Sequence, residues 1–244
     1  MNSPRYWLVV PAAGIGQRMQ SSLPKQYLQI RQRPVIDITL SRLLDGNLFA
    51  GCVVALHADD RWWTTTDSCR DARIVTCAGG SARQDSVSAA LALLSQRASP
   101  EDWVLVHDVA RPCVAQGDLH RLITEVSGHP VGGLLASPVT DTLKRATSDQ
   151  QVAATVDRQD LWRALTPQMF RLGALRSALR AAANAGVPVT DEASAIEHTG
   201  KRPALVQGRS DNLKITWPGD LAIAELVLDR LAACNQPDTG ESLS

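Results

Sequence analysis

Residues 6–26 read YWLVVPAAGIGQRMQSSLPKQ, an apolar segment that runs into a loop of small residues. The β-branched and aromatic residues at 6–10 predict a buried strand, and Pro11 predicts its end, because proline cannot donate to a central ladder. Gly14 and Gly16 let the backbone approach a ligand closely and turn N–H groups toward an anion. The stretch therefore predicts a phosphate-binding loop after a first strand.

Two cations accompany this loop. Arg18 and Lys25 lie four and eleven residues beyond Gly14, and cations beside phosphates neutralise charge that moves during a reaction. Two common glycine motifs do not match: the dinucleotide-binding pattern needs a small residue where this chain has Met19, and the Walker A pattern needs a second glycine followed by lysine. We expect a triphosphate cradle with Arg18 and Lys25 as catalytic cations; the alternative is an ordinary glycine-rich turn.

Short apolar runs alternate with amphipathic stretches along the rest of the chain. Further strands are predicted at 52–56, 73–77, 103–107, 131–136 and near 203–206. Apolar spacings of three and four residues predict helices around 87–94, 119–126, 172–183 and 220–233. Because the apolar runs lack polar alternation, the strands should be buried on both faces. This predicts an α/β fold with a mostly parallel twisted sheet flanked by helices, and such sheets bind ligands at the carboxyl ends of their strands.

Composition narrows the function classes. The 244 residues include 25 basic and 25 acidic side chains, a balance that argues against a nucleic-acid or membrane surface as the main partner. The five cysteines are widely spread without a C-x-x-C pair, which is typical of reduced thiols, and we see no signal-peptide pattern at the start. We expect a cytoplasmic protein with a single domain over residues 1–234 and a disordered tail at 235–244.

One segment interrupts the alternation. Residues 137–160 are polar and apolar in turn without a helical stripe, which predicts an extended arm inserted in the domain. A two-stranded arm cannot bury enough apolar surface alone, so we expect it to pack on another subunit. A long disordered loop is the alternative.

An acidic residue follows the strand at 103–107. Asp108 would lie at the carboxyl end of that strand, opposite the loop after the first strand, where one carboxylate can hold a Mg²⁺ that bridges phosphate oxygens. The alternative is a turn in which Asp108 pairs with Arg111.

Two further sets of residues have weaker signals. Residues 79–86 (GGSARQDS) lie between a strand and a helix, where backbone and hydroxyl groups can contact a base. A second anionic substrate needs cations of its own, and the candidates are Arg111, Arg158 and Lys214. Each of them alone is more typical of a solvated charge. Residues 190–192 predict a helix start with Thr190 as its cap, and we assign them no chemistry.

Seven ordered motifs carry a resemblance to a known family. They are PAAGIGQRMQSSLPKQY, GGSARQDSV, VHDVARP, PVTDTLKR, TVDRQDLWRALTPQ, TDEASAIE and RSDNLKIT. Together they resemble the bacterial 2-C-methyl-D-erythritol 4-phosphate cytidylyltransferases from about residue 7 to 230. The resemblance implies a Rossmann-like nucleotidyltransferase that combines CTP with a polyol phosphate in non-mevalonate isoprenoid synthesis and uses Mg²⁺ or another divalent ion. It also implies a homodimer in which an arm completes the neighbour's active site.

The resemblance also implies roles for individual residues. Arg18 and Lys25 match transition-state stabilisers, and Asp108 matches a carboxylate linked to the metal and nucleotide. The matches to nucleotide-binding positions are Ala12, Ala13, Gly14, Gly16, Gly80, Ser81 and Ser86. The matches around the polyol phosphate are Arg111, Thr142, Arg158, Thr166 and Lys214, of which Thr142 and Arg158 would come from the partner.

Three positions depart from the family pattern, and three other functions stay open. Ser81 stands where Asp is frequent, Val109 where Ala is commoner, and Trp217 where Arg or Thr is common. The alternative functions are a cytidylyltransferase for another polyol phosphate such as ribitol 5-phosphate, a sugar-1-phosphate nucleotidyltransferase that uses another base, and a non-catalytic nucleotide sensor. The last predicts that Arg18, Lys25 or Asp108 is altered, and all three are intact.

Overall fold

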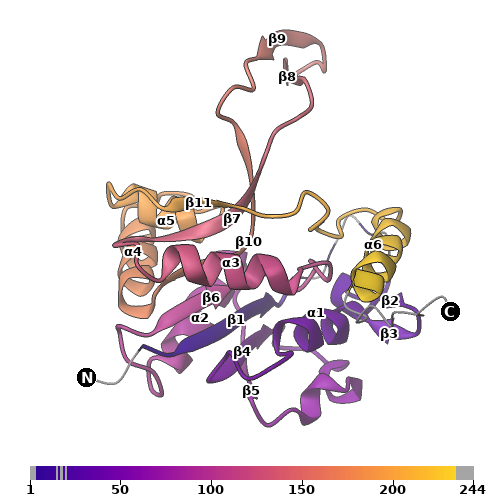
Figure 1. The fold of residues 1–244 in the computed structure, drawn as a ribbon, viewed down its shortest axis with the longest axis vertical. Helices are drawn as coiled ribbons and strands as arrows, with labels where there is room; N and C mark the ends of the chain where they lie inside the picture. The colour runs from indigo at the N-terminus through magenta and orange to yellow at the C-terminus, as the bar shows by residue number, and fades with distance from the viewer. Residues whose placement is uncertain (1–3, 15, 17–18, 20, 235–244) are drawn as a thin grey trace, which may run out of the picture.

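A seven-stranded sheet forms the centre of the molecule. The computed structural model describes residues 4–14, 16, 19 and 21–234. The strand order across the sheet is β11-β7-β10-β6-β1-β4-β5 (Figure 1). The strands are β1 (Tyr6–Ala12), β4 (Gly51–Leu56), β5 (Ile74–Ala78), β6 (Trp103–Val106), β7 (Gly132–Pro138), β10 (Trp162–Arg171) and β11 (Ala204–Gln207). All run parallel except β10, which is antiparallel to both of its neighbours. The predicted mostly parallel α/β sheet is confirmed.

Helices cover both faces of this sheet. They are α1 (Val35–Leu43), α2 (Arg83–Leu94), α3 (Gln116–Val126), α4 (Leu172–Asn184), α5 (Glu192–His198) and α6 (Asp220–Cys234). Side chains of α1 and α3 pack with Leu8 and Val10 of β1 in one core cluster. Those of α2, α4 and α5 pack with Trp7 and Val9 in a second cluster on the opposite face. Successive residues of β1 thus enter two cores, which explains why the strand has no polar alternation.

The first strand is longer than expected. β1 continues through Pro11 to Ala12, and Pro11 is in register with Ala55 of β4. The His107 N–H, just after β6, donates to the Val9 carbonyl over 2.9 Å. The backbone groups of Val9 therefore face β6. Residues alternate between the two neighbours, so Pro11 shares that side with Val9, where β6 has already ended at Val106. The missing N–H of proline therefore costs no ladder bond, and the predicted end at Pro11 is wrong.

The predicted arm is present as a hairpin. Its strands are β8 (Leu143–Ala146) and β9 (Val152–Val156), which pair antiparallel. The hairpin and the two connecting segments that lead to it extend away from the body (Figure 1). The Val139 N–H donates to the Leu161 carbonyl over 2.9 Å and closes its base. The structure thus has paired strands where a disordered loop was the alternative, while the predicted tail at 235–244 lies outside the described residues.

Two smaller features complete the body. A short pair of strands, β2 (Gln29–Ile30) and β3 (Arg33–Pro34), precedes α1. Helix α6 packs against Ile30, Ile38 and Ile215 in a third core cluster. Within the part of the chain that is described, no helix has the length and apolar character needed to cross a bilayer.

Candidate functional site

A cavity of about 170 Å³ opens at the carboxyl ends of the parallel strands. Its walls come from the loop after β1, the turn before α2, the residues after β6, and Lys214. Eight of the residues predicted for the nucleotide and for catalysis line it: Ala12, Ala13, Gly14, Lys25, Gly80, Ser81, Ser86 and Asp108. Residues separated by about a hundred positions in the sequence thus form one pocket, which we call the nucleotide pocket.

The loop after β1 folds tightly over Lys25. Gly16 has a φ of +68°, and a Cβ there would lie 3.0 Å from the Cβ and Cγ of Lys25. Both observations favour glycine at this position. Lys25 begins the short 3-10 helix η2 (Lys25–Tyr27), and its Nζ donates to the Ile215 carbonyl over 3.3 Å. Arg18, the second predicted catalytic cation, lies outside the described residues.

The turn before α2 approaches this loop closely. A Cβ on Gly79 would lie 2.6 Å from the Cβ of Ala13 and 2.7 Å from Oγ of Ser86, so only glycine fits between them. The Gly80 N–H donates to Ser86 Oγ over 3.2 Å. The carboxylate of Asp85 accepts from the Ala82 N–H and the Ser81 hydroxyl, at 3.1 and 3.2 Å. These contacts fix the shape of the turn that the sequence predicts as a base-binding segment.

Asp108 lies just after β6 among three cations. Its Oδ1 accepts from Nε of Arg83 at 2.8 Å, and its Oδ2 is 2.8 Å from Nζ of Lys214 and 3.7 Å from Nε of Arg111. Burial alone would raise the pKa of Asp108, but Arg83, Lys214 and Arg111 together hold this pKa well below its usual range. The carboxylate is therefore ionised at neutral pH.

A second cavity, of about 250 Å³, lies on the other side of this carboxylate. Three of the residues predicted for the second substrate line it: Arg111, Thr166 and Lys214. Arg83, Asp108 and Lys214 border both cavities and form a shared wall. We call this cavity the acceptor pocket. Thr142 and Arg158 do not line either cavity; both are exposed at the base of the hairpin, where Arg158 donates to the Thr140 carbonyl.

A buried histidine determines how Thr166 can bind a ligand. The ring Nε2 of His107 is 3.0 Å from the Arg111 carbonyl, which only accepts, so Nε2 carries the hydrogen. Burial lowers the pKa of His107 to about 4, and the ring is neutral at pH 7. Its Nδ1 must then accept from the Thr166 hydroxyl, 3.0 Å away, while that oxygen accepts from the Asp108 N–H at 3.2 Å. The hydroxyl oxygen of Thr166 can therefore only accept a hydrogen bond from a ligand.

Three residues that the sequence analysis does not assign support the site. Asn212 is fully buried; its carbonyl accepts from Nη1 of Arg111 at 2.6 Å, and its Nδ2 donates to the Thr166 carbonyl at 2.9 Å. Arg83, a residue of the shared wall, forms an ion pair with the buried Glu192, with its Nη1 and Nη2 at 2.7 and 3.0 Å from the two carboxylate oxygens.

The expected cap of α5 also needs correction. Asp191, not Thr190, caps this helix, because its carboxylate accepts from the Ser194 N–H over 2.9 Å. Glu192, to which the sequence analysis assigns no chemistry, is 1% exposed. The sequence contains both partners of this ion pair, Arg83 in GGSARQDS and Glu192 in TDEASAIE. No rule of sequence spacing predicts that they pair.

Comparison with known proteins agrees with this geometry. The family model for IspD, 2-C-methyl-D-erythritol 4-phosphate cytidylyltransferase, matches residues 6–230. The chain belongs to the IspD family. It is 56% identical over 221 residues to the 2-C-methyl-D-erythritol 4-phosphate cytidylyltransferase of Ectopseudomonas mendocina (strain ymp), covering 90% of this chain and 94% of that enzyme. The enzyme of Pseudomonas aeruginosa (strain UCBPP-PA14) is 53% identical over 219 residues, covering 89% and 94%.

Solved structures agree with the fold of this IspD-family chain. The crystal structure of the 2-C-methyl-D-erythritol 4-phosphate cytidylyltransferase of Francisella tularensis superposes with a TM-score of 0.80 at 36% identity. The match covers 91% of this chain and 99% of that one. A crystal structure of 4-diphosphocytidyl-2C-methyl-D-erythritol synthase superposes with a TM-score of 0.81 at 37% identity, covering 93% and 100%. The family resemblance and the cytidylyltransferase assignment made from the sequence are confirmed.

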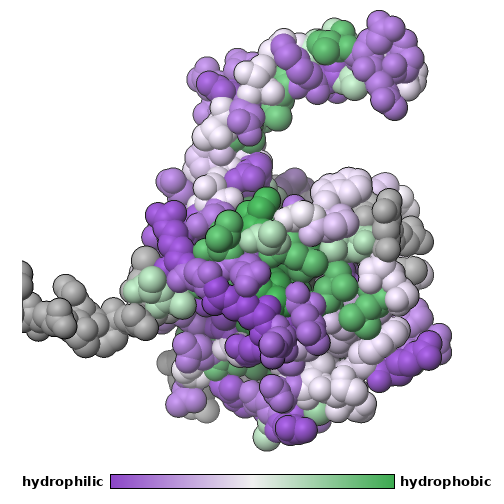
Figure 2. Space-filling model, turned by 90° about the vertical axis from the view of Figure 1, so that its right-hand side faces the viewer, coloured by the Kyte–Doolittle hydropathy of each residue, from purple (hydrophilic) through white to green (hydrophobic). Residues whose placement is uncertain are grey.

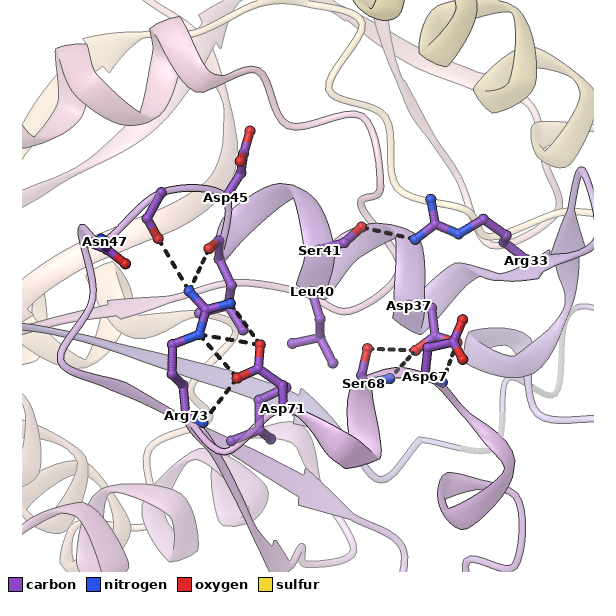
Figure 3. Close-up of a pocket in the computed structure, with 13 residues that line it drawn as sticks. Arg33, Asp37, Leu40, Ser41, Asp45, Asn47, Asp67, Ser68, Asp71 and Arg73 are labelled. Atoms are coloured by element: carbon purple, nitrogen blue, oxygen red, sulfur yellow. Dashed lines mark hydrogen bonds and ion pairs between the residues drawn. The ribbon is translucent and has the colours of Figure 1, made fainter.

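A larger cavity of this IspD-family chain lies away from both pockets. It measures about 580 Å³ and lies between α1 and the 3-10 helix η4 (Ser68–Arg70). Several of its charged groups are held by other groups of the protein (Figure 3). Arg73 pairs with Asp71 at 2.7 Å and donates to the Leu44 carbonyl, while Asp37 accepts from the N–H and hydroxyl of Ser68. Size alone therefore does not single out a candidate reaction site.

Proposed function

We propose that this chain transfers the cytidylyl group of CTP to 2-C-methyl-D-erythritol 4-phosphate and releases pyrophosphate by direct in-line attack. The observation that carries the proposal is the wall shared by the nucleotide and acceptor pockets, made of Arg83, Asp108 and Lys214. Two ligands in these pockets would be separated only by that wall. A substrate phosphate could therefore reach the α-phosphorus of a bound CTP, and proximity of this kind supplies much of the rate of a two-substrate reaction.

The chemistry needs charge stabilisation more than proton transfer. The attacking phosphate is already ionised at neutral pH, so no general base is required. Lys25, on the β1 side of the nucleotide pocket, and Arg18, in the same loop by sequence, would neutralise the charge that develops at the α-phosphorus. Loop amides after β1 would add hydrogen bonds to the phosphates.

The remaining predicted residues would bind the two substrates. Ala12, Ala13, Gly80, Ser81 and Ser86 would surround the cytidine, with Gly14 and Gly16 shaping the loop around the phosphates. Arg111 and Lys214 supply positive charge in the acceptor pocket, which suits a phosphate. Thr166 accepts hydrogen bonds only, which suits a hydroxyl of the polyol better than a phosphate oxygen.

The residues at the shared wall fit a divalent ion that arrives with the nucleotide. Among the described residues no group of three or more His, Cys, Asp or Glu side chains could hold a metal by itself. Asp108 is ionised and lines the nucleotide pocket, and Mg²⁺ commonly takes one carboxylate together with phosphate oxygens. Asp108 would therefore hold Mg²⁺, or another divalent ion, which when bound would neutralise phosphate charge.

We further propose that the enzyme is a homodimer whose hairpins complete each other's acceptor pockets with Thr142 and Arg158. Two observations support this. The hairpin extends away from its own body (Figure 1), and Val152 on it is 66% exposed. Apolar side chains also gather on the face of the body that carries α6 (Figure 2), where Trp217 and Leu226 are 57% and 70% exposed. Apolar surface of this kind is typical of interfaces.

Pyrophosphate release from purified protein tests the activity. The assay would combine CTP and Mg²⁺ with 2-C-methyl-D-erythritol 4-phosphate or ribitol 5-phosphate in turn, and CTP would be replaced by UTP in a second series. We expect release to be fastest with CTP and the methylerythritol phosphate. Faster release with ribitol 5-phosphate would reassign the acceptor, and no release with either acceptor would reject the proposal.

A further inference from the structure

Arg83 of the shared wall is paired with a buried carboxylate, that of Glu192. Arg83 begins α2 and Glu192 begins α5. The two terminal nitrogens of Arg83 donate to the two oxygens of Glu192 at 2.7 and 3.0 Å, and its Nε donates to Asp108 at 2.8 Å. The guanidinium therefore links the two carboxylates, and each of its three nitrogens donates one of the three hydrogen bonds.

The two carboxylates differ in what they can reach. Asp108 borders both pockets, whereas Glu192 is 1% exposed and lines neither of them. Glu192 therefore does not contact a ligand in either pocket, and its hydrogen-bonded link to the shared wall is Arg83. A bidentate carboxylate fixes a guanidinium in position and plane, so Glu192 determines where the Nε of Arg83 points.

The charges around Asp108 show why the position of Arg83 matters. Three cations surround Asp108: Arg83, Lys214 and Arg111. Glu192 and Asp108 together balance two of these three cations, so the group keeps a net single positive charge that attracts substrate phosphates. Without Glu192, the guanidinium would lose its anchor and could turn toward a phosphate in either pocket, and Asp108 would lose its fixed partner.

We propose that Glu192 is a positioning residue for the transfer reaction: it anchors Arg83, and Arg83 holds Asp108 in place between the two pockets. This inference rests on the proposed function and deepens it. It predicts a separation between binding and turnover. Removing the charge of Glu192 leaves more uncompensated positive charge in the site, so metal-free anions bind more tightly, while a displaced Asp108 slows the transfer step.

The first experiment compares Glu192→Gln with wild-type enzyme. We expect kcat to fall about 10- to 100-fold, the loss that a small displacement of a reacting group causes, with the KM for CTP unchanged or lower. Glu192→Asp keeps the charge and should recover part of kcat. Glu197→Gln changes an exposed acid on the same helix and should leave both parameters at wild-type values. A variant that has a lower melting temperature but normal kcat per folded molecule would show a purely structural role.

A double-mutant cycle tests whether Glu192 acts through Arg83. In Arg83→Met, Glu192 becomes a buried carboxylate without its partner, and we expect Tm to fall by roughly 6 to 20 °C. Adding Glu192→Gln should raise Tm again, because the unpaired charge is removed. The kcat of the double variant should match that of Arg83→Met within about twofold. If instead the two losses of kcat multiply, Glu192 acts independently of Arg83 and the inference is rejected.

A binding measurement separates this inference from the proposed function. Calorimetry with CTP in the presence of EDTA does not depend on turnover. We expect Glu192→Gln to bind metal-free CTP roughly threefold to tenfold more tightly than wild type, because a cation has lost its internal partner, and Glu197→Gln to bind it equally. If wild-type enzyme released no pyrophosphate, the proposed function would fail. Tighter binding by Glu192→Gln would then still support the anchoring role, and unchanged binding would overturn it.

Discussion

Lys25 is the described residue that the proposed mechanism uses most directly. It lines the nucleotide pocket from the start of η2, and the loop at Gly16 packs against its side chain. Lys25→Ala removes a cation that acts on charge developing at the α-phosphorus. We expect kcat to fall about 10²- to 10³-fold, as for other well-placed donors, with a much smaller change in CTP affinity measured by calorimetry. Lys201→Ala, at an exposed position, is the matched control. Normal turnover in Lys25→Ala would remove Lys25 from the mechanism.

Thr166 gives a second prediction at this scale. Thr166→Val keeps the shape of the side chain but leaves the Asp108 N–H and Nδ1 of His107 without partners. Since the lost oxygen is also the hydrogen-bond acceptor that we propose for the polyol, we expect the KM for the polyol phosphate to rise about 5- to 100-fold. Thr166→Ser should stay near wild type. A substrate analogue that lacks the bound hydroxyl should not distinguish the variants, and an unchanged KM for the full substrate in Thr166→Val would contradict the acceptor role.

The positions of individual residues could be predicted where those residues share one loop or directly follow a predicted strand. Gly14 and Lys25 share one loop and Asp108 follows a strong strand, so motif reasoning could place them at one edge of a parallel sheet. Arg83 and Glu192 lie 109 positions apart, and each of them alone resembles a solvated helix-terminal charge. Their pairing depends on how α5 packs against α2 through α4, which no spacing in the sequence expresses.

At the scale of elements, the strand β10 is the main feature that the sequence analysis did not find. It is the central antiparallel strand and carries Thr166, yet it has no continuous apolar run and contains Pro167. Proline within a run argues against a central strand. The register between β10 and β7 shifts between Ala164 and Gln168, so the ladder is interrupted around Pro167. Local propensity is overridden here by pairing with β6 and β7, both of which were predicted.

The opposite end of the sheet offers a test of stability without chemistry. Asp102 precedes β6 and accepts from the Arg5 N–H, Nε1 of Trp7 and the Ser99 N–H at 3.0, 2.9 and 3.1 Å. Burial raises its pKa, but these hydrogen bonds outweigh burial and hold the pKa of Asp102 below its usual value. We expect Asp102→Asn to destabilise the fold by about 1–3 kcal/mol and to leave kcat unchanged.

The pH dependence of this loss has a definite sign. A carboxyl group with a lowered pKa in the folded state adds stability above its unfolded pKa, and this stability disappears as pH falls through the folded value. The gap in Tm between wild type and Asp102→Asn, measured by differential scanning calorimetry, should therefore be full at pH 7 and shrink below about pH 4. A gap that stays constant down to pH 3 would show that packing, not the ionised carboxylate, causes the loss.

At the scale of the whole molecule, most of the residues proposed for the site line two adjoining cavities, and two of them lie apart on the arm. The nucleotide and acceptor pockets are assembled by the sheet, whereas the hairpin that carries Thr142 and Arg158 extends from the body (Figure 1). The sequence predicted such an arm from its lack of apolar periodicity. In the proposed dimer the arm contacts a second chain, and there Thr142 and Arg158 would serve the reaction in trans.

Mixing two inactive variants tests this arrangement. Lys25→Ala damages the nucleotide pocket and leaves the hairpin intact, and Arg158→Ala does the reverse. In a dimer of one chain of each kind, the Arg158→Ala chain keeps its own Lys25 and receives Arg158 from its partner, so one of the two sites is complete. After unfolding and refolding an equal mixture, half of the dimers are mixed, and pyrophosphate release should recover to about a quarter of the wild-type rate. If Arg158 acted within its own chain, mixing would restore nothing, because every site would still lack one of the two residues. Recovery should also disappear when the mixture is diluted below the concentration at which the dimer dissociates, which ties the activity to the assembly itself.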